Sequence, residues 1–155
     1  MPLLIDTIGE HGLPTADLLL FALPGVGDVG KNAIEMLNES SQAERVARFI
    51  HPGLAPLARL DEDGLLAPPH LYGSLFTTPT GQRVMTVTGP GQPSDPSHQY
   101  DFTQELLEAF SKSEIPEILV LAGLSSPPEK KEAFVVASSS AHRVNMEEKG
   151  VDVRR

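Results

Sequence analysis

One stretch of sequence decides how this chain folds, and it reads Leu23-Pro24-Gly25-Val26-Gly27-Asp28-Val29-Gly30-Lys31-Asn32. A continuously apolar run at residues 18–23 leads into this stretch, and such a run is typical of a strand covered on both faces of an α/β sheet. Apolar residues with helical spacing follow it and predict a helix whose core-facing stripe consists of Val29, Ala33, Met36 and Leu37. The stretch therefore predicts a strand, a glycine-rich turn and a helix.

The glycine pattern matches two phosphate-binding signatures, neither of them completely. Gly25, Gly27 and Gly30 give the G-x-G-x-x-G spacing of dinucleotide-binding proteins. Gly25, Gly30 and Lys31 give the G-x-x-x-x-G-K spacing of nucleoside triphosphatases, but Asn32 stands where that signature has the hydroxyl that ligates magnesium. A nucleotide or nucleoside site at Gly25, Gly27, Gly30 and Lys31 is thus one interpretation of this loop.

Two further observations weaken that interpretation. Asp28 places a carboxylate inside the loop that would receive an anion, where like charges repel. The dinucleotide signature also needs an acid about 20 residues on, at the end of the second strand, and that predicted strand ends in Arg48-Phe49-Ile50-His51. We therefore predict no catalytic and no cofactor-binding residues, and interpret the glycines as allowing a tight turn and close packing of the helix on the sheet.

The rest of the chain predicts a mixed α/β fold. Residues 45–50 predict a second strand, and with the first strand and the helix they predict a βαβ unit over 17–50. The proline-rich and acidic residues 52–70 predict irregular structure. An antiparallel hairpin is expected near 71–89. Further predicted elements are a helix with Asp101 as its N-cap and a stripe of Phe102, Leu106, Ala109 and Phe110, a buried strand at 117–123 and a strand at 133–138. Together they predict one domain over residues 1–155, with a mainly parallel sheet flanked by helices.

Composition excludes several classes of function. None of the 155 residues is cysteine, which excludes disulfides and thiolate chemistry and favours a reducing, cytoplasmic setting. Twelve basic and 21 acidic side chains give a net charge of -9, so we expect no nucleic acid partner. No apolar run is long enough for a membrane span, and the five scattered histidines predict no metal site. Ser125-Ser126 and Ser138-Ser139-Ser140 follow predicted strands without the G-x-S-x-G pattern of a nucleophile.

The run at residues 18–33 resembles the opening motif of the proteasome assembly chaperone 2 family. The likeness continues at residues 65–69, at 89–93 before Tyr100, and at 118–124. The resemblance implies an α/β fold similar to nucleoside phosphorylases and a non-enzymatic protein that binds protein subunits, proteasome α subunits among them, and forms homo-oligomers. The likeness covers only the first part of the family domain, so the resemblance implies either a domain that is incomplete at its C-terminal end or a compact member of the family. Residues 151–155 lack the hydrophobic-Tyr-any tail with which family members dock on proteasomes.

Overall fold

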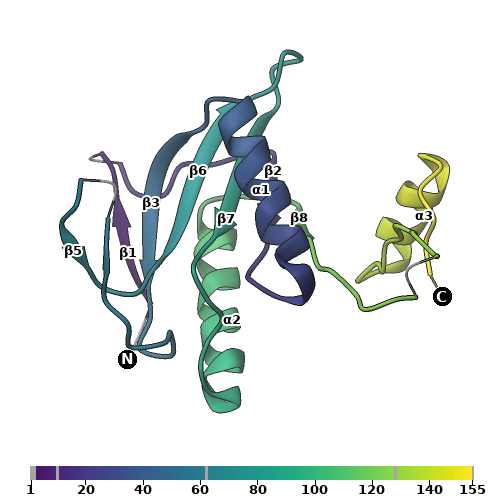
Figure 1. The fold of residues 1–155 in the computed structure, drawn as a ribbon. Helices are drawn as coiled ribbons and strands as arrows, with labels where there is room; N and C mark the ends of the chain where they lie inside the picture. Colours follow the sequence, from purple (N-terminus) through teal and green to yellow (C-terminus); the bar gives the residue numbers. More distant parts are fainter. Residues whose placement is uncertain (1–2, 10, 62, 128, 155) are drawn as a thin grey trace. The chain divides into compact units, whose positions relative to one another are not determined.

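The structure is a computed structural model that describes residues 3–9, 11–61, 63–127 and 129–154. It contains two compact units, Met1–Gly123 and Leu124–Arg155, which are described separately. The single domain over residues 1–155 stays a prediction. The elements labelled in Figure 1 are β1 (Leu4–Thr7), β2 (Leu18–Phe21), the 3-10 turn η1 (Val26–Asp28), α1 (Val29–Ser40), β3 (Glu44–Ile50), β4 (Arg59–Leu60), β5 (Leu66–Ala67), β6 (Leu71–Thr77), β7 (Arg83–Thr88), α2 (Pro96–Lys112), β8 (Ile118–Val120) and α3 (Ser140–Glu148).

The first unit is built on a six-stranded sheet in the order β1-β3-β6-β7-β2-β8. β2 runs parallel to both β7 and β8, whereas the neighbours β1 and β3, β3 and β6, and β6 and β7 are antiparallel. The prediction of a mixed sheet and of the 71–89 hairpin is confirmed, and the prediction that the sheet is mainly parallel is wrong. The reason is the hairpin itself: β6 and β7 lie between β2 and β3, so the two strands of the expected βαβ unit are not neighbours.

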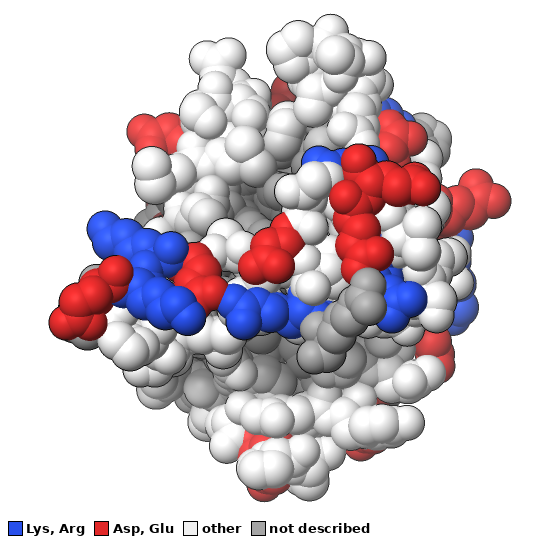
Figure 2. All heavy atoms as spheres, turned by 90° about the vertical axis from the view of Figure 1, so that its right-hand side faces the viewer, with Lys and Arg blue, Asp and Glu red and all other residues white. Residues whose placement is uncertain are grey.

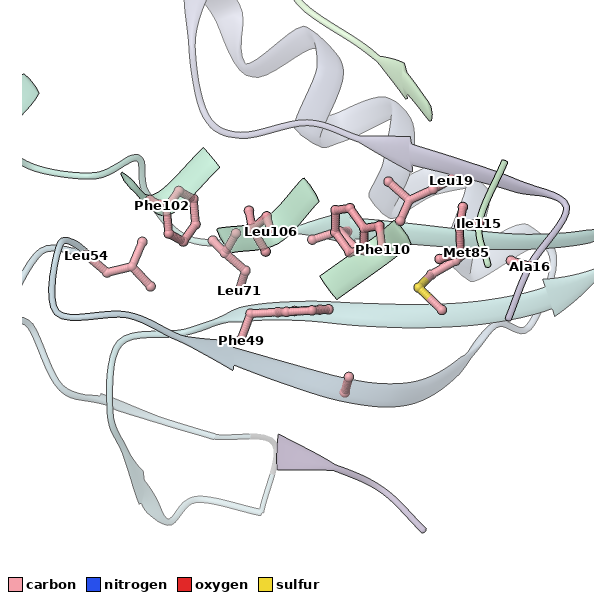
Figure 3. Packing of buried hydrophobic residues seen from close by; sticks show 12 residues of the cluster. Ala16, Leu19, Phe49, Leu54, Leu71, Met85, Phe102, Leu106, Phe110 and Ile115 are labelled. Carbon is pink, nitrogen blue, oxygen red and sulfur yellow. The ribbon is translucent and has the colours of Figure 1, made fainter. Parts of the chain in front are cut away.

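α2 and one face of the sheet enclose the main apolar core (Figure 3). Phe102, Leu106 and Phe110 of α2 are buried, as the sequence predicts. The ring of Phe110 meets the ring of Phe49 on β3 edge to face, with 5.9 Å between centroids. The helix begins at Pro96 rather than after Asp101, because the Asp95 side chain accepts a hydrogen bond from the N–H of Ser97 at 2.8 Å and caps an earlier start.

α1 packs against the opposite face of the sheet through different residues from those predicted. Gly30 and Ile34 are the buried positions of this helix, and the side chains of Val29, Ala33 and Met36 are exposed. The prediction of a core-facing stripe is therefore wrong for these three residues, and its fourth member, Leu37, is half-buried. Two polar contacts help to set the rotation of the helix: Thr86 donates to Asn38 Oδ1 at 2.7 Å, and the Tyr72 hydroxyl donates to Glu35 Oε1 at 2.9 Å.

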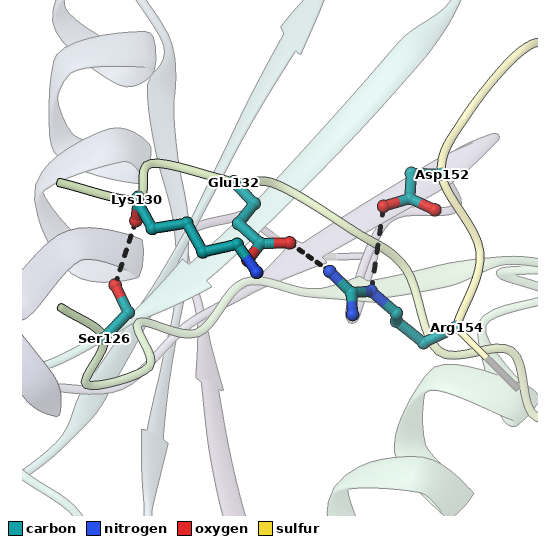
Figure 4. A network of polar contacts seen from close by, with 5 residues as sticks. All are labelled: Ser126, Lys130, Glu132, Asp152 and Arg154. Atoms are coloured by element: carbon teal, nitrogen blue, oxygen red, sulfur yellow. Dashed lines mark hydrogen bonds and ion pairs between the residues drawn. The ribbon is translucent and has the colours of Figure 1, made fainter.

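The second unit, residues 124–155, is held together by polar contacts (Figure 4). Arg154 pairs with Glu132 and lies over the Phe134 ring at 4.6 Å from its centroid. Its described residues include none that is buried. The predicted strand at 133–138 is reduced to an isolated bridge between Val135 and Val153, and the helix α3, which the sequence did not predict, begins at Ser140.

Candidate functional site

The three glycines of the loop between β2 and α1 have different structural roles. Gly27 has φ of +62°, a conformation that side chains with a Cβ rarely adopt. Gly30 lies so close to the backbone carbonyl of Leu121 that a Cβ would collide with it. Gly25 has neither constraint, since a Cβ there would find no atom nearer than 3.9 Å. Gly27 thus serves the turn, and Gly30 allows the close approach of α1 to the end of β8.

The other loop residues are arranged poorly for a phosphate. Asp28 precedes α1 with φ of +49°, and its carboxylate makes no capping hydrogen bond. Lys31 points to Glu35 one helical turn on, with 3.6 Å between Nζ and Oε1. Arg48 and His51 lie on or after β3, which three strand spacings of about 4.8 Å separate from β2. The structure therefore does not bring these basic groups together with Gly25, Gly27, Gly30 and Lys31.

A cleft of about 270 Å³ opens at the carboxyl ends of β2 and β8. Open α/β sheets bind ligands at this edge. Phe21, Phe102 and Val120 line the cleft together with the polar side chains of Gln92 and Gln99. This edge of the sheet therefore carries a concavity, but its polar lining comes from α2 and the preceding loop rather than from the glycine loop.

The chemistry of this cleft is neutral. Its lining residues within the described chain include no charged side chain, and its polar groups are the amides of Gln92 and Gln99 and the hydroxyl of Thr103. The Gln92 amide donates to the Pro24 carbonyl at 2.7 Å, and the Thr103 hydroxyl donates to the Gln99 carbonyl at 2.7 Å. Ligand pockets usually measure about 300–1,000 Å³ and orient their ligands through a few polar groups, Gln amides and Thr hydroxyls among them. The cleft offers neither a general base nor a nucleophile.

His51 is the most enclosed of the ionisable side chains near the core. It is 5% exposed, its Nδ1 accepts the N–H of Gly53 at 2.9 Å, and its ring meets that of Phe102 at 5.2 Å between centroids. Burial lowers the pKa of His51, and the carboxylate of Glu105, with Oε1 3.9 Å from Nε2, acts in the opposite direction. His51 is a core residue, because its side chain is buried and its Nδ1 is already hydrogen-bonded within the chain. Among the described residues no group of three metal-ligating side chains comes together.

The serines after the predicted strands serve local structure. Ser126 donates to the Lys130 carbonyl at 3.2 Å. Ser139 is the N-cap of α3 and accepts the N–H of His142 at 3.2 Å, with 3.1 Å between its Oγ and the Nδ1 of that ring. The contact is a helix cap.

An exposed apolar surface runs along α1, and we call Val29, Ala33 and Met36 the α1 stripe. Val29 is 58% exposed and Met36 is 71% exposed. The spacing of three and four residues places these side chains on one side of the helix. The apolar residues of the stripe have the spacing of a core-facing helix. The stripe lies in solvent because Gly30 and Ile34 are the residues through which α1 packs on the sheet.

A family model described as the PAC2 family matches residues 19–153. The chain belongs to the PAC2 family. No curated protein matches it significantly. The match includes the glycine loop, the cleft and the α1 stripe, so all three are parts of a PAC2 domain.

Solved structures show the same fold at low sequence identity. This PAC2 chain superposes on Pyrococcus furiosus PbaB, described as an archaeal proteasome activator, with a TM-score of 0.79 and 20% identity over 99% of this chain and 67% of that one. For P. furiosus PbaA, described as an archaeal homologue of proteasome-assembly chaperone, the TM-score is 0.72 with 15% identity over 99% and 64%. A Thermoplasma acidophilum protein of unknown function gives 0.66 with 16% identity over 92% and 56%. The chain thus spans about two thirds or less of the length of these proteins.

Proposed function

We propose that this PAC2 protein is a non-enzymatic, chaperone-like protein that binds other protein subunits during assembly, with proteasome α subunits as the first candidates. The α1 stripe carries the proposal. Contiguous apolar side chains on a fixed helix are typical of a protein-binding surface, and Val29 and Met36 are more than half exposed. PbaB and PbaA, which share the fold, are described as a proteasome activator and a homologue of a proteasome-assembly chaperone.

Charge and the cleft support the same proposal. The neutral cleft has no acid, base or nucleophile among its described lining residues, which argues for binding rather than catalysis. Figure 2 shows both acidic and basic side chains on the face it presents, and the net charge of -9 disfavours a nucleic acid partner. Among the described helices none is long and apolar enough to cross a membrane. We place the protein in the cytoplasm because a chain without cysteine suits a reducing compartment.

Self-association is part of the proposal. β8 (Ile118–Val120) pairs only with β2 among the described strands, so it forms one edge of the sheet. An uncovered edge strand offers unpaired backbone groups to another chain. We propose that copies of the chain form a homo-oligomer. Sedimentation equilibrium will then give a particle mass that is a multiple of the mass of one chain, which is 16.7 kDa for these 155 residues.

The test of the main proposal is co-elution of the full-length gene product with purified proteasome α subunits. The wild-type protein should form a complex. The double variant Val29→Ser/Met36→Ser should bind about tenfold more weakly if the α1 stripe is an interface centre. Leu107→Ser on α2, where the side chain is 48% exposed, is the matched control and should bind like the wild type. Absence of a complex, with normal ring assembly in cells that lack the gene, would contradict the proposal.

The position of the cleft favours one alternative, a protein that binds a nucleotide or nucleoside. A thermal-shift series with ATP, GTP, NAD, NADP and free nucleosides at millimolar concentration separates the two functions, because a ligand bound only by the folded state raises the melting temperature. We expect no shift. A shift that disappears in Gln99→Ala, at a residue whose amide lines the cleft, would establish the alternative.

A further inference from the structure

A second exposed apolar surface lies on the β4–β5 hairpin, in the segment where the sequence predicted irregular structure. Leu60 of β4 and Leu66 of β5 are cross-strand partners, so their side chains lie on one face of the hairpin. They are 71% and 77% exposed. Leu57 and Leu65 nearby are 63% and 64% exposed. We call Leu60 and Leu66 the hairpin surface; single exposed leucines need no explanation, but these two share a face and lie within ten residues that contain two further exposed leucines.

Hydrogen bonds hold the hairpin in shape. The Oδ1 of Asp61 accepts the N–H groups of Asp63 at 3.0 Å and of Leu65 at 2.8 Å, and the N–H of Asp61 donates to the Leu65 carbonyl at 2.8 Å. Ala67, on the face of the ladder opposite Leu66, is buried at 3% exposure. The register thus places Leu60 and Leu66 on one face of the hairpin, and on the other face Ala67 is buried while its partner Arg59 is exposed. A preorganised surface loses little conformational entropy when it binds.

The charge around the hairpin surface indicates the chemistry of its partner. The turn that joins the strands carries the half-buried Asp61 and the exposed Asp63, with Glu62 between them in the sequence, and the strands carry one exposed basic side chain, that of Arg59. Residues 1–123 contain six of the twelve basic side chains and sixteen of the 21 acidic ones, a net charge of six minus sixteen, or -10. At this surface a second copy of the chain would present the same acidic turn and an anionic membrane the same sign of charge, so neither is complementary to it.

We propose that the hairpin surface docks in an apolar depression rimmed by Lys and Arg on a partner protein. The inference rests on the proposed protein-binding function and adds a second contact to it. The leucines supply the apolar centre of the interface, and the Asp61 and Asp63 carboxylates at its edge meet the basic rim of the partner. This arrangement gives binding that weakens with salt, since rim charges are screened.

The experiment places a photoreactive amino acid at position 66 of the full-length protein in its own cells, and at position 107 as a control, and identifies the cross-linked protein. The partner is then purified and its affinity measured with four proteins: wild type, Leu60→Ser/Leu66→Ser, Asp63→Asn and Leu107→Ser. We expect the double variant to bind about tenfold more weakly. We expect Asp63→Asn to lose part of the salt dependence and Leu107→Ser to be unchanged. Circular dichroism checks that the double variant is folded.

The outcomes separate this inference from the proposed function. If position 66 cross-links to a protein other than an α subunit and the double variant loses affinity for it, the hairpin inference stands and the proteasome proposal falls. If α subunits bind wild type and double variant equally, the hairpin inference falls and the proposed function stands. Cross-links only to further copies of the chain, or none at position 66, would overturn the inference.

Discussion

The two faces of the central sheet are covered in contrasting ways. On the α2 face, aromatic and aliphatic side chains such as Phe49 and Phe110 form a continuous apolar core. On the α1 face, a close backbone approach at Gly30 and polar contacts from Asn38 and Glu35 hold the helix, whose own apolar stripe lies in solvent. α2 therefore supplies the apolar core of the domain, whereas α1 is attached in a way that leaves its apolar residues exposed to solvent.

The largest effect should come from the α2 face. Phe49→Ala removes a fully buried ring that packs edge to face on Phe110, and we expect the free energy of unfolding to fall by about 3–5 kcal/mol. Urea unfolding followed by circular dichroism measures it. Phe49→Leu, which keeps most of the volume, should lose about 1.5 kcal/mol or less. Equal losses in the two variants would show that the site is not closely packed.

A glycine series tests the close approach on the α1 face. Gly30→Ala places a Cβ against the Leu121 carbonyl and should lose about 1–3 kcal/mol of stability. Gly27→Ala places alanine at positive φ and should lose about 1–2 kcal/mol. Gly25→Ala is the matched control and should change little, because a Cβ there has space. Chemical denaturation ranks the three variants, and an undisturbed Gly30→Ala would disprove the steric explanation.

The polar attachment of α1 should contribute a loss of similar or smaller size. Asn38→Ala removes the acceptor for the buried Thr86 hydroxyl, and an unsatisfied buried group costs about 1–3 kcal/mol. In Thr86→Val/Asn38→Ala both polar partners are gone, so part of the stability should return. A double-mutant cycle measures the coupling between the two residues. A coupling of zero would show that the hydrogen bond does not position the helix.

The α2 face should also respond to pH through His51. Burial lowers the pKa of His51 in the folded chain, so the unfolded chain binds the proton more readily. The contribution of this site is complete above the unfolded pKa of about 6.5 and declines as the pH falls from there toward the folded pKa. Urea unfolding between pH 8 and pH 5 should show the decline in the wild type and in the control His11→Asn, at an exposed residue. A similar decline in His51→Asn would show that His51 is not its source.

The smallest effect on stability should come from the α1 stripe. Met36→Ser changes a side chain that is 71% exposed, so the free energy of unfolding should change by no more than about 0.5 kcal/mol. Any loss of partner binding in this variant is then a loss of contact rather than of folding. A fall in stability like that of Gly30→Ala would mean that the stripe packs against the rest of the protein.

Local patterns predicted the elements that short-range physics controls. The strand, turn and helix around residues 18–40, the hairpin at 71–89 and the buried stripe Phe102, Leu106 and Phe110 were all predicted from periodicity and turn residues. The start of α2 was predicted too late because Asp95-Pro96 is an equally good beginning. The cleft could not be predicted, since Gln92, Gln99 and Val120 meet only after three separate segments have packed.

Turn glycines, apolar runs and helical spacing are local properties of the chain. They are therefore sufficient to predict an α/β domain with a glycine turn ahead of α1. Only the tertiary structure decided which side of α1 faces the sheet. Val29, Ala33 and Met36 have the pattern of a core stripe, but the contact of Gly30 with Leu121 and the bond from Thr86 to Asn38 turn the helix the other way. Those contacts join residues far apart in sequence, and they place the apolar stripe in solvent.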